Sequence, residues 1–554
     1  MKNWRVNLIF FLIFLFAAAI TSRLVFIQIR DREYWKAMAQ GQHRYFASAV
    51  AIRGEIFLKD VTGNSYRLAT GRDWPYVCVS AEKIFNRGEE AESIIKKISE
   101  ILELDETVLL PKIEDSFNVC EVIKTRITPE QDEALNAAAL PGVYIKTEKL
   151  RYYPQEIFLS DVLGFVGGEG TGQYGLEGYY EKSLQGVAGF VEGERGLFTK
   201  TSAEKGKDLD LTIDYNIQFT AENLLAKAKT NLNIEGGTII VGDPFSGELF
   251  ALANYPTYNP NEYAKEENLE VFKNDAIQKV YEPGSTIKPI TMAAGLEEGV
   301  ITPETSYVDE GFVKIAGHTL TNYNQRVYGK ATMTEVLEKS INTGAVFAER
   351  QVGQEKFLEY LERFGFFEPT GIDLQGEVFS ENKNLKAGRE INYATAAFGQ
   401  GIEITPMQMF RAFCAIANGG KLVQPHLVEN PPEEVVVDER RAISSETANQ
   451  LTTMLVNVTE KGFGKAARIP GYYIAGKTGT AQVAFTSLGI DKEGYSEKTN
   501  QIFIGFAPAY DPRFLILIKL DNPEARTAEY SALPIFRELA KYVIDYLQIP
   551  PDYE

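Results

Sequence analysis

The chain has 554 residues, which is more than one compact core usually holds, so we expect two or three domains. Hydrophobic residues make up 44% of it and charged residues 24%, a composition that excludes a disordered or fibrous protein. The formal net charge of -19 argues against a nucleic-acid partner, because phosphates would be repelled by such a surface.

The first residues predict a membrane anchor. Residues 6–22 contain no charged side chain and would span about 26 Å as a helix, near the lower limit for crossing a bilayer. Lys2 and Arg5 precede this run and favour a cytoplasmic tail at residues 1–5. A cleaved signal peptide is the alternative, because residues 17–19 are alanines that a peptidase could accept. We prefer an uncleaved single-pass anchor, with the rest of the chain outside the cytoplasm.

Residues 23–206 alternate short β-like runs with turns and read as an α+β module without a reactive constellation. Residues 90–115 predict an amphipathic helix followed by a shorter one. Cysteines are too few for a disulfide-stapled scaffold, since the chain has three: Cys78, Cys120 and Cys414. Cys78 and Cys120 could pair in an exported protein, but we expect unpaired, buried thiols.

From residue 207 to 554 the pattern changes. Asp214 is a candidate N-cap for a helix that runs to about residue 232. Residues 237–255 predict a β-hairpin, and residues 500–522 predict a second one that turns at Asp511-Pro512. The chain closes with an amphipathic helix whose apolar stripe is Leu533, Phe536, Leu539, Val543 and Leu547. These elements predict one antiparallel sheet with helices packed on it.

The stretch YEPGSTIKPIT, residues 281–291, has two interpretations. Ser285 could simply begin a helix, or it could be a nucleophile whose proton acceptor, Lys288, lies one turn away. The Ser-x-x-Lys spacing alone is weak evidence, because it recurs at Ser80, Ser93, Ser202 and Ser380. The setting of Ser285 is more specific: Gly284 precedes it, and an apolar run predicts a buried helix with Ser285 at its N-terminus. A lysine buried there would lose its proton more readily.

Two further motifs follow. Ser340-x-Asn342 would be a helix cap or turn if it stood alone. Lys477-Thr478-Gly479 lies in a predicted strand, where Gly479 would admit another backbone, although a bulged surface strand is the alternative. Ser285, Ser340 and Lys477 follow one another at intervals of 55 and 137 residues, in the order typical of penicillin-binding proteins and serine β-lactamases.

The chain resembles the class B penicillin-binding proteins, the membrane-anchored peptidoglycan D,D-transpeptidases. The resemblance rests on EPGSTIKP, KSINTG, FGQGIEITPMQM, AGKTGTAQV, IGFAPAYDPR and YSALPIF, and before them on RYYP, VLGFVG and GLEGYYEKSLQG. It implies an α+β protein with an N-terminal transmembrane helix, an extended pedestal module (residues 23–206) and a transpeptidase domain (residues 207–554). That domain would be an antiparallel sheet flanked by helices, with a helical subdomain. One departure concerns the pedestal: RGEIFLKDVTG, residues 53–63, places its Asp further along than the family does and lacks a second Arg.

The resemblance also implies the site. Ser285 would attack the carbonyl between the terminal D-alanines of a stem peptide, Lys288 would accept its proton, and Ser340 would relay the proton to the leaving group. Asn342 would hold the substrate amide and Lys288. Lys477 and Thr478 would bind the terminal carboxylate, the strand through Gly479 would pair with the peptide, and the N–H groups of Ser285 and Thr480 would form the oxyanion hole. No cofactor or metal is implied, and His43, His318 and His426 lie outside these motifs.

Several rival functions share these motifs. The anchor and the pedestal argue against a D,D-carboxypeptidase or a β-lactamase. A bifunctional glycosyltransferase would need acidic motifs that are not recognisable here, and the intact set of three motifs argues against a non-catalytic scaffold. A penicillin sensor would need a cytoplasmic effector, for which five residues are too few. Within the family the GFAPAYDPR stretch favours a septal over an elongation enzyme. β-Lactams, stem peptides, the membrane and a polytopic glycan polymerase are the expected partners.

Overall fold

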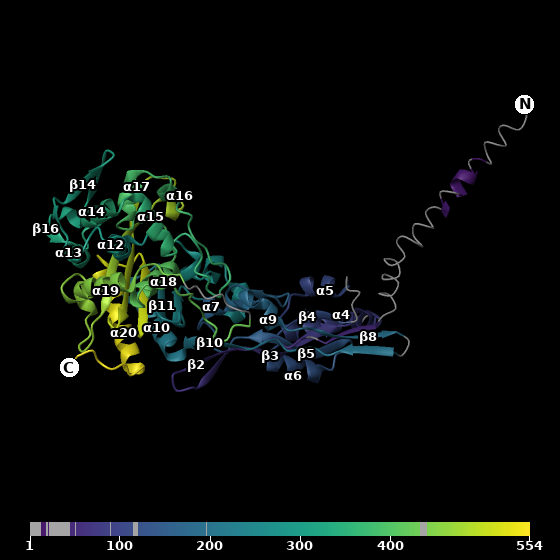
Figure 1. The fold of residues 1–554 in the computed structure, drawn as a ribbon. Helices are drawn as coiled ribbons and strands as arrows, with labels where there is room; N and C mark the ends of the chain where they lie inside the picture. Colours follow the sequence, from purple (N-terminus) through teal and green to yellow (C-terminus); the bar gives the residue numbers. More distant parts are fainter. Residues whose placement is uncertain are drawn as a thin grey trace, which may run out of the picture. The chain divides into compact units, whose positions relative to one another are not determined.

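The computed structural model describes residues 11, 13–17, 20–21, 45–49, 51–88, 90–114, 120–194, 197–432 and 440–553 (Figure 1). Most of the predicted tail and anchor, residues 1–22, lies outside this set. Among the described residues no helix is both long and apolar enough to cross a membrane. The chain divides into two compact units, one of residues 1–54 with 185–207 and one of residues 55–184 with 208–554. The predicted boundary at residues 206 and 207 stays a prediction.

The smaller unit contains a three-stranded antiparallel sheet in the order β1-β8-β9. Its strands are β1 (Tyr45–Ala49), β8 (Gly189–Glu194) and β9 (Leu197–Thr201). β8 pairs with β1 along one edge and with β9 along the other, so segments from the two ends of the pedestal sequence share one sheet.

The pedestal part of the larger unit is a second sheet built around one long strand. This strand, β3, pairs with β2, β4 and β5 along its length, and β10 adds in parallel to β2. The strands are β2 (Ile56–Lys59), β3 (Ser65–Val79), β4 (Glu121–Lys124), β5 (Val143–Tyr152) and β10 (Leu209–Asp214). Four helices accompany them: α3 (Ala81–Phe85), α4 (Glu90–Leu102), α5 (Glu106–Glu114) and α6 (Pro129–Ala138). The pair α4 and α5 confirms the predicted helix followed by a shorter one, and Ile94, Ile95, Ile98 and Leu102 are buried.

The pedestal also corrects one prediction. Cys78 in β3 and Cys120 just before β4 form a disulfide, with Cα atoms 5.2 Å apart, so the expectation of unpaired thiols was wrong for this pair. β3 and β4 pair side by side, with Cys78 opposite Val122, and this brings two cysteines 42 residues apart into bonding range. Cys414 is free and buried, as predicted.

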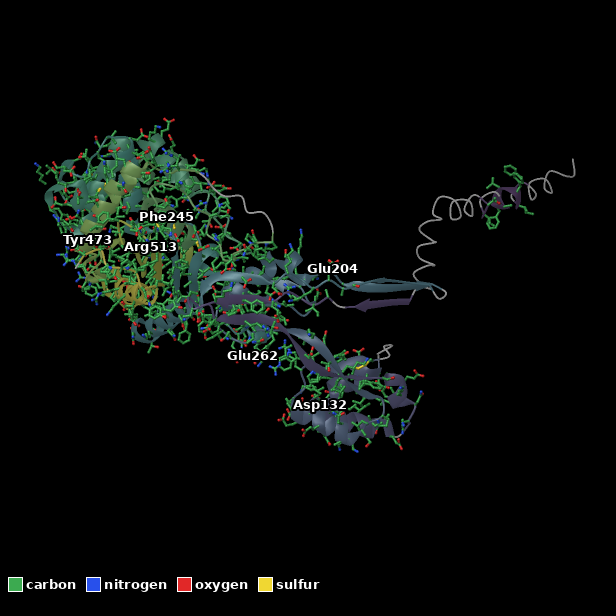
Figure 2. All side chains as sticks on the ribbon, turned by 60° about the horizontal axis from the view of Figure 1, so that its bottom comes forward. Asp132, Glu204, Phe245, Glu262, Tyr473 and Arg513 are labelled. Carbon is green, nitrogen blue, oxygen red and sulfur yellow. A yellow bond between two sulfur atoms is a disulfide. The ribbon has the colours of Figure 1, made fainter. Side chains whose placement is uncertain are left out.

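A five-stranded sheet in the order β12-β11-β19-β18-β17 forms the centre of the C-terminal part, and all its strand pairs are antiparallel. The strands are β11 (Gly236–Gly242), β12 (Leu249–Tyr255), β17 (Ala475–Ala484), β18 (Tyr495–Ala507) and β19 (Phe514–Asp521). Both predicted hairpins are confirmed. Phe245 and Arg513, labelled in Figure 2, lie in their two connecting turns.

Helices cover both faces of this sheet. α10 (Tyr215–Leu232) and α20 (Ala532–Tyr546) pack on one face, and Asp214 caps α10 as predicted by accepting from the backbone N–H groups of Asn216 and Ile217. α12 (Lys288–Glu297), α18 (Pro406–Ala417) and α19 (Ser445–Glu460) contribute to the core on the other face. Because both faces are covered, every residue of the central strand β19 is buried.

The remaining elements connect the modules and build a helical subdomain beside the sheet. Those before the sheet are α7 (Ser160–Leu163), β6 (Phe165–Val166), β7 (Gly172–Gln173), α8 (Gly175–Tyr179) and α9 (Glu181–Gln185). Those within the C-terminal part are η2 (Pro260–Lys265), η3 (Leu269–Phe272), α11 (Asp275–Gln278), η4 (Gly284–Ile287), β13 (Ser306–Asp309), β14 (Phe312–Ile315), β15 (His318–Thr321), η5 (Tyr323–Gln325), β16 (Gly329–Thr332), α13 (Met333–Glu338), α14 (Asn342–Val352), α15 (Gln354–Arg363), α16 (Lys383–Lys386), α17 (Glu390–Ala396), η6 (Lys465–Ala467), η7 (Thr486–Leu488) and η8 (Ala528–Tyr530).

Candidate active site

Ser285 lies in η4, the single 3-10 turn that leads into α12. Its side chain is partly exposed, whereas Thr286 and Lys288 are buried. Thr286 Oγ1 donates to the carbonyl oxygen of Pro283 at 2.7 Å and so closes the turn. The predicted position of Ser285 at the start of a buried helix is therefore what the structure shows.

Lys288 is fully buried and bonds to the second motif. Its Nζ donates to the carbonyl oxygen of Ser340 at 2.6 Å and to Asn342 Oδ1 at 2.8 Å, and it lies 3.3 Å from Ser340 Oγ. Within the described part of the chain Lys288 makes no hydrogen bond to Ser285 Oγ, although the i, i+3 spacing suggested one. Its amine bonds instead to residues at and after the link that follows α13.

The electrostatic surroundings of Lys288 favour the neutral amine. Burial lowers its pKa well below the usual value, and the positive charge of Lys477 lowers it further. A neutral amine has two N–H donors and one lone pair. The two shortest contacts, to the Ser340 carbonyl and Asn342 Oδ1, account for both donors. The lone pair is then left to accept a hydroxyl proton.

Ser340 joins the two lysines. It occupies the short link between α13 and α14 with a left-handed backbone (φ 52), which turns the chain toward the site. Its Oγ lies 3.3 Å from Lys288 Nζ and accepts from Lys477 Nζ at 3.1 Å. One hydroxyl thus contacts the lysines of both other motifs.

Asn342 is fixed from both ends of its amide. Its Oδ1 accepts from Lys288, and its Nδ2 donates to the carbonyl oxygen of Thr321 at 3.0 Å. The next residue, Thr343, donates from Oγ1 to Asp309 at 2.6 Å and receives support from Asn322, whose Oδ1 accepts from the Thr343 N–H at 3.1 Å.

Sequence reasoning missed the support from Asp309 and Asn322. Both side chains are buried, and they lie in or next to short strands of the subdomain. No spacing links Asp309 to Asn342, and nothing in the local pattern marks either residue. The only signal in the sequence is that both are polar residues near apolar ones, and this pattern is too common to identify them as supports of the site.

β17 brings the third motif to the site. Lys477 is fully buried, its Nζ donates to the carbonyl oxygen of Thr478 at 3.0 Å, and burial lowers its pKa to about 7. Thr478 is 8% exposed. Thr480 Oγ1 accepts from the backbone N–H of Ala528 at 3.1 Å, so that side chain is held by η8.

Gly479 explains how the strand and the nucleophile turn come so close. A Cβ at Gly479 would lie 2.9 Å from Thr286 Cγ2 and 3.1 Å from the carbonyl oxygen of Pro283. Only a residue without a side chain permits this approach, as the sequence predicted. β17 pairs with β18 on one side and is the last strand of its sheet among the described residues.

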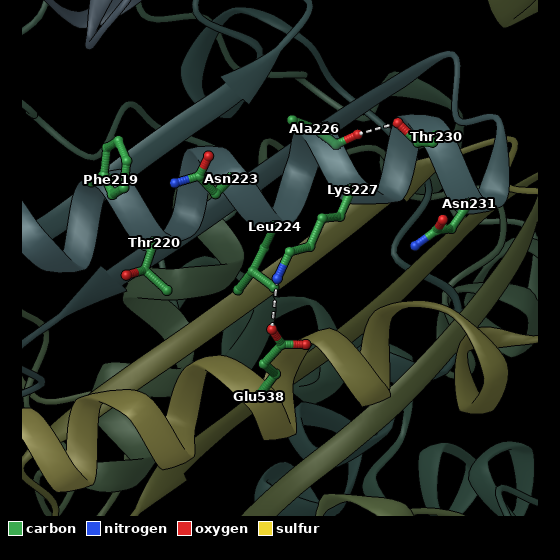
Figure 3. Close-up of a pocket in the computed structure, with 9 residues that line it drawn as sticks. All are labelled: Phe219, Thr220, Asn223, Leu224, Ala226, Lys227, Thr230, Asn231 and Glu538. Atoms are coloured by element: carbon green, nitrogen blue, oxygen red, sulfur yellow. Dashed lines mark hydrogen bonds and ion pairs between the residues drawn. The ribbon is translucent and has the colours of Figure 1, made fainter.

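Two other features lie away from these residues. A groove of about 500 Å³ lies between α10 and α20 and is crossed by an ion pair of 3.0 Å between Lys227 and Glu538 (Figure 3); none of the three motifs lines it. Of the histidines outside the motifs, His318 is in β15, the Nδ1 of His426 contacts the carbonyl oxygen of Gln424, and His43 lies outside the described residues.

Comparison with known proteins gives consistent matches over nearly the whole chain. The family model "Penicillin binding protein transpeptidase domain" matches residues 237–541, and "Penicillin-binding Protein dimerisation domain" matches residues 48–211. Stage V sporulation protein D of Bacillus subtilis is 30% identical over 99% of this chain and 86% of its own length. Peptidoglycan D,D-transpeptidase FtsI of Buchnera aphidicola is 29% identical over 99% of this chain and 96% of its own.

Solved structures agree with these matches. The crystal structure of penicillin-binding protein 3 from Mycobacterium tuberculosis, complexed with aztreonam, has a TM-score of 0.70 and 25% identity. The match covers 91% of this chain and 98% of that one.

Proposed function

The chain belongs to the class B penicillin-binding proteins, and we propose that it is a peptidoglycan D,D-transpeptidase that cross-links stem peptides through an acyl-enzyme on Ser285. One observation supports this assignment of the site above all others. Ser340 Oγ lies within hydrogen-bond distance of the lysines of the other two motifs, so three segments that are far apart in the sequence meet at this hydroxyl, and the segment of Lys288 also carries Ser285.

Acylation begins with a proton transfer. Ser285 Oγ attacks the carbonyl carbon between the two terminal D-alanines while Lys288, neutral in its buried site, takes the hydroxyl proton. The tetrahedral oxyanion lies between the N–H groups of Ser285 and Thr480, donors typically worth about 3 kcal/mol each in the transition state. When the peptide bond breaks, the proton passes through Ser340 Oγ to the amine of the leaving D-alanine. The products are free D-alanine and an ester on Ser285.

The donor peptide is held by the third motif. Lys477 and Thr478 supply a cation and a hydroxyl for the terminal carboxylate, a charge-assisted contact that is stronger than a neutral one. The strand through Gly479 pairs with the peptide backbone as an added strand. A bound carboxylate favours the protonated form of Lys477, and that charge in turn keeps Lys288 neutral.

The second half-reaction decides between a transpeptidase and a hydrolase. An amine of a neighbouring stem attacks the Ser285 ester, forms an amide cross-link and returns the proton to Ser285 Oγ. β-Lactams would acylate the same serine, and a penicillin-binding relative of this chain has been solved complexed with aztreonam.

The cellular setting is inferred from the N-terminal segment and from one stretch of the C-terminal part. Residues 6–22 would anchor the chain as a single pass, with the tail in the cytoplasm and the catalytic domain outside it. The GFAPAYDPR stretch, residues 505–513, supports a septal role over an elongation role. A polytopic glycan polymerase would be the partner that supplies nascent strands, through the anchor and the pedestal.

A donor and acceptor assay tests the activity directly. The full chain is incubated with a synthetic pentapeptide donor ending in D-Ala-D-Ala and an amine acceptor peptide, and the products are separated by mass spectrometry. We expect D-alanine release with a cross-linked product, and neither with Ser285→Ala. D-alanine release with tetrapeptide as the sole product would make the protein a carboxypeptidase, and no turnover by a folded protein would favour a scaffold.

A further inference from the structure

The backbone immediately before Ser285 is packed against a second loop. Tyr281 and Ile404 exchange two backbone hydrogen bonds of 2.9 and 3.0 Å, and the N–H of Gly284 donates to the carbonyl oxygen of Gly399 at 3.0 Å. A Cβ on Gly399 would lie 2.0 Å from the carbonyl oxygen of Gly284. The nucleophile turn and residues 399–404 are therefore in backbone contact.

Glu282, three residues before the nucleophile, ties this contact to a third element. Its Oε1 accepts from the N–H of Gly401 at 3.0 Å and from the hydroxyl of Tyr495 at 3.2 Å. Tyr495 begins β18 and pairs with Ala484 of β17, the strand of the Lys477 motif. One carboxyl group thus bonds to both elements that flank the nucleophile turn.

The second carboxyl oxygen of Glu282 lacks a hydrogen-bond partner among the described residues. This oxygen, Oε2, is buried. An ionised carboxylate with a buried, unpaired oxygen is costly, whereas the protonated acid is much less so.

The surroundings of Glu282 also favour the protonated acid. Burial is the main cause that raises its pKa to about 7, and the neighbouring carboxylate of Glu403 acts in the same direction. The titratable groups that face it are Tyr495 on β18 and Glu403 on the 399–404 loop. The described part of the chain places no lysine or arginine in an ion pair with it.

We propose that Glu282 is a positioning residue for acylation. In its protonated form it holds the turn of Ser285 against residues 399–401 and Tyr495, and when it ionises these contacts weaken. This inference rests on the proposed function, because it concerns the reaction of Ser285. Ionisation leaves a negative charge in a buried site beside Glu403, which favours entry of water and separation of the loop from the turn. Acylation should therefore weaken as the pH rises through the neutral range.

The test measures acylation of the full-length chain in detergent by fluorescent penicillin between pH 5.5 and 9, separating the binding constant from the acylation rate constant. Glu282→Gln keeps an acceptor oxygen for Gly401 and Tyr495 but cannot ionise. We expect it to acylate at the wild-type rate at pH 6 and to lose part of the decline above pH 7. Glu282→Ala should lower the acylation rate constant by about tenfold or more, with binding little changed, because misplaced reacting groups lose rate rather than affinity.

Glu222→Gln is the matched control. Glu222, in α10, is another carboxyl whose pKa burial raises to about 7, but its partners are Gln218 and the N–H of Leu159. Its replacement should leave the pH profile of acylation unchanged. If Glu282→Ala fails to fold, Glu282→Gln and Tyr495→Phe still test the proposal.

Two results would overturn the inference: a Glu282→Gln profile that superposes on the wild type at every pH, or a folded Glu282→Ala that acylates normally. Either result, with Ser285 labelled in the wild type, leaves the proposed function intact. A wild-type chain that takes no label on Ser285 would instead overturn the proposed function itself.

Discussion

Lys288 and Lys477 both contact Ser340 Oγ, yet their surroundings suit them to different tasks. Lys288 is buried and also feels the charge of Lys477, so its amine is the easier one to deprotonate. The pKa of Lys477 is about 7, so this amine can keep its proton near neutral pH when an anion binds. A pair whose environments separate their protonation states provides a base and a cation in one site.

An exchange of each lysine for arginine tests this division. Lys288→Arg keeps a cation but removes the base, because a guanidinium does not deprotonate in proteins. We expect it to lower the acylation rate by roughly 10²-fold or more at pH 7–9, the range typical of a lost general base. Lys477→Arg keeps the cation that its task requires and should lose much less. Equal losses in the two variants, measured by stopped-flow labelling, would contradict the assignment.

The residues of the three motifs could be found in the sequence, whereas the residues that hold them in place could not. Ser285, Ser340 and Lys477 belong to short motifs whose order and spacing are distinctive. Asp309 and Glu282 support them through contacts that depend on the finished fold, and no spacing in the sequence announces either role.

Among the elements, β17 and η4 are held at a distance that only Gly479 allows. Thr286, which a Cβ at this position would meet, is itself fixed by its bond to Pro283 and cannot move aside. The close approach of the strand to the nucleophile turn therefore depends on the lack of a side chain at position 479.

Gly479→Ala should separate the two elements. We expect a loss of about 1–3 kcal/mol in the free energy of unfolding, as for other overpacked sites, and a larger relative loss of acylation. Gly168→Ala is the control, since its Cβ would meet only Tyr263 Oη at 3.9 Å. Calorimetry and penicillin labelling measure the two effects, and a Gly479→Ala protein that labels at the wild-type rate would refute this account of the glycine.

Asp309 provides a second test at the element scale. Its carboxylate accepts from the N–H groups of Gly311 and Tyr328 and from the side chains of Asn322 and Thr343. Asp309→Asn replaces an acceptor oxygen by a donor, which should cost about 1–3 kcal/mol of stability and reduce acylation through Asn342. Asp105→Asn, at an exposed turn of the pedestal, should change neither quantity measurably. Normal acylation by folded Asp309→Asn would show that Asn342 does not depend on this support.

The elements that could be predicted are those whose sequence signals lie within a short stretch of the chain. The two hairpins, α10 and α20 depend on turn residues, a cap and an apolar stripe, all within about twenty residues of sequence. The pairing of β10 with β2 and the long β3 depend on contacts between distant segments. The sequence predicted a pedestal of short strands and helices but not how its strands pair.

For the whole molecule, the disulfide is the clearest correction. The Cys78–Cys120 bond joins β3 to the residue before β4, and it fits an extracytoplasmic location, where such bonds persist. The sequence left this open, because two cysteines 42 residues apart give no indication of whether the strands that contain them are neighbours.

Counting thiols and measuring stability test the bond. Unfolded without reductant, the protein isolated from its native compartment should take up one alkyl group, at Cys414, and after reduction it should take up three. Replacing Cys78 and Cys120 by serine should lower the free energy of unfolding by roughly 2–4 kcal/mol, the usual effect of closing a loop of this length. Uptake of three groups before reduction would show that the two thiols are free.

If the three motifs together make Ser285 a nucleophile, a β-lactam forms its covalent adduct on that serine, and the position of the adduct can be measured. The purified protein is incubated with fluorescent penicillin, digested, and the labelled peptide is identified by mass spectrometry, with Ser93→Ala as a control that alters another Ser-x-x-Lys pair. We predict one stable adduct on Ser285, retained in Ser93→Ala and lost in folded Ser285→Ala. A label on another serine, or persistent labelling of Ser285→Ala, would contradict the account.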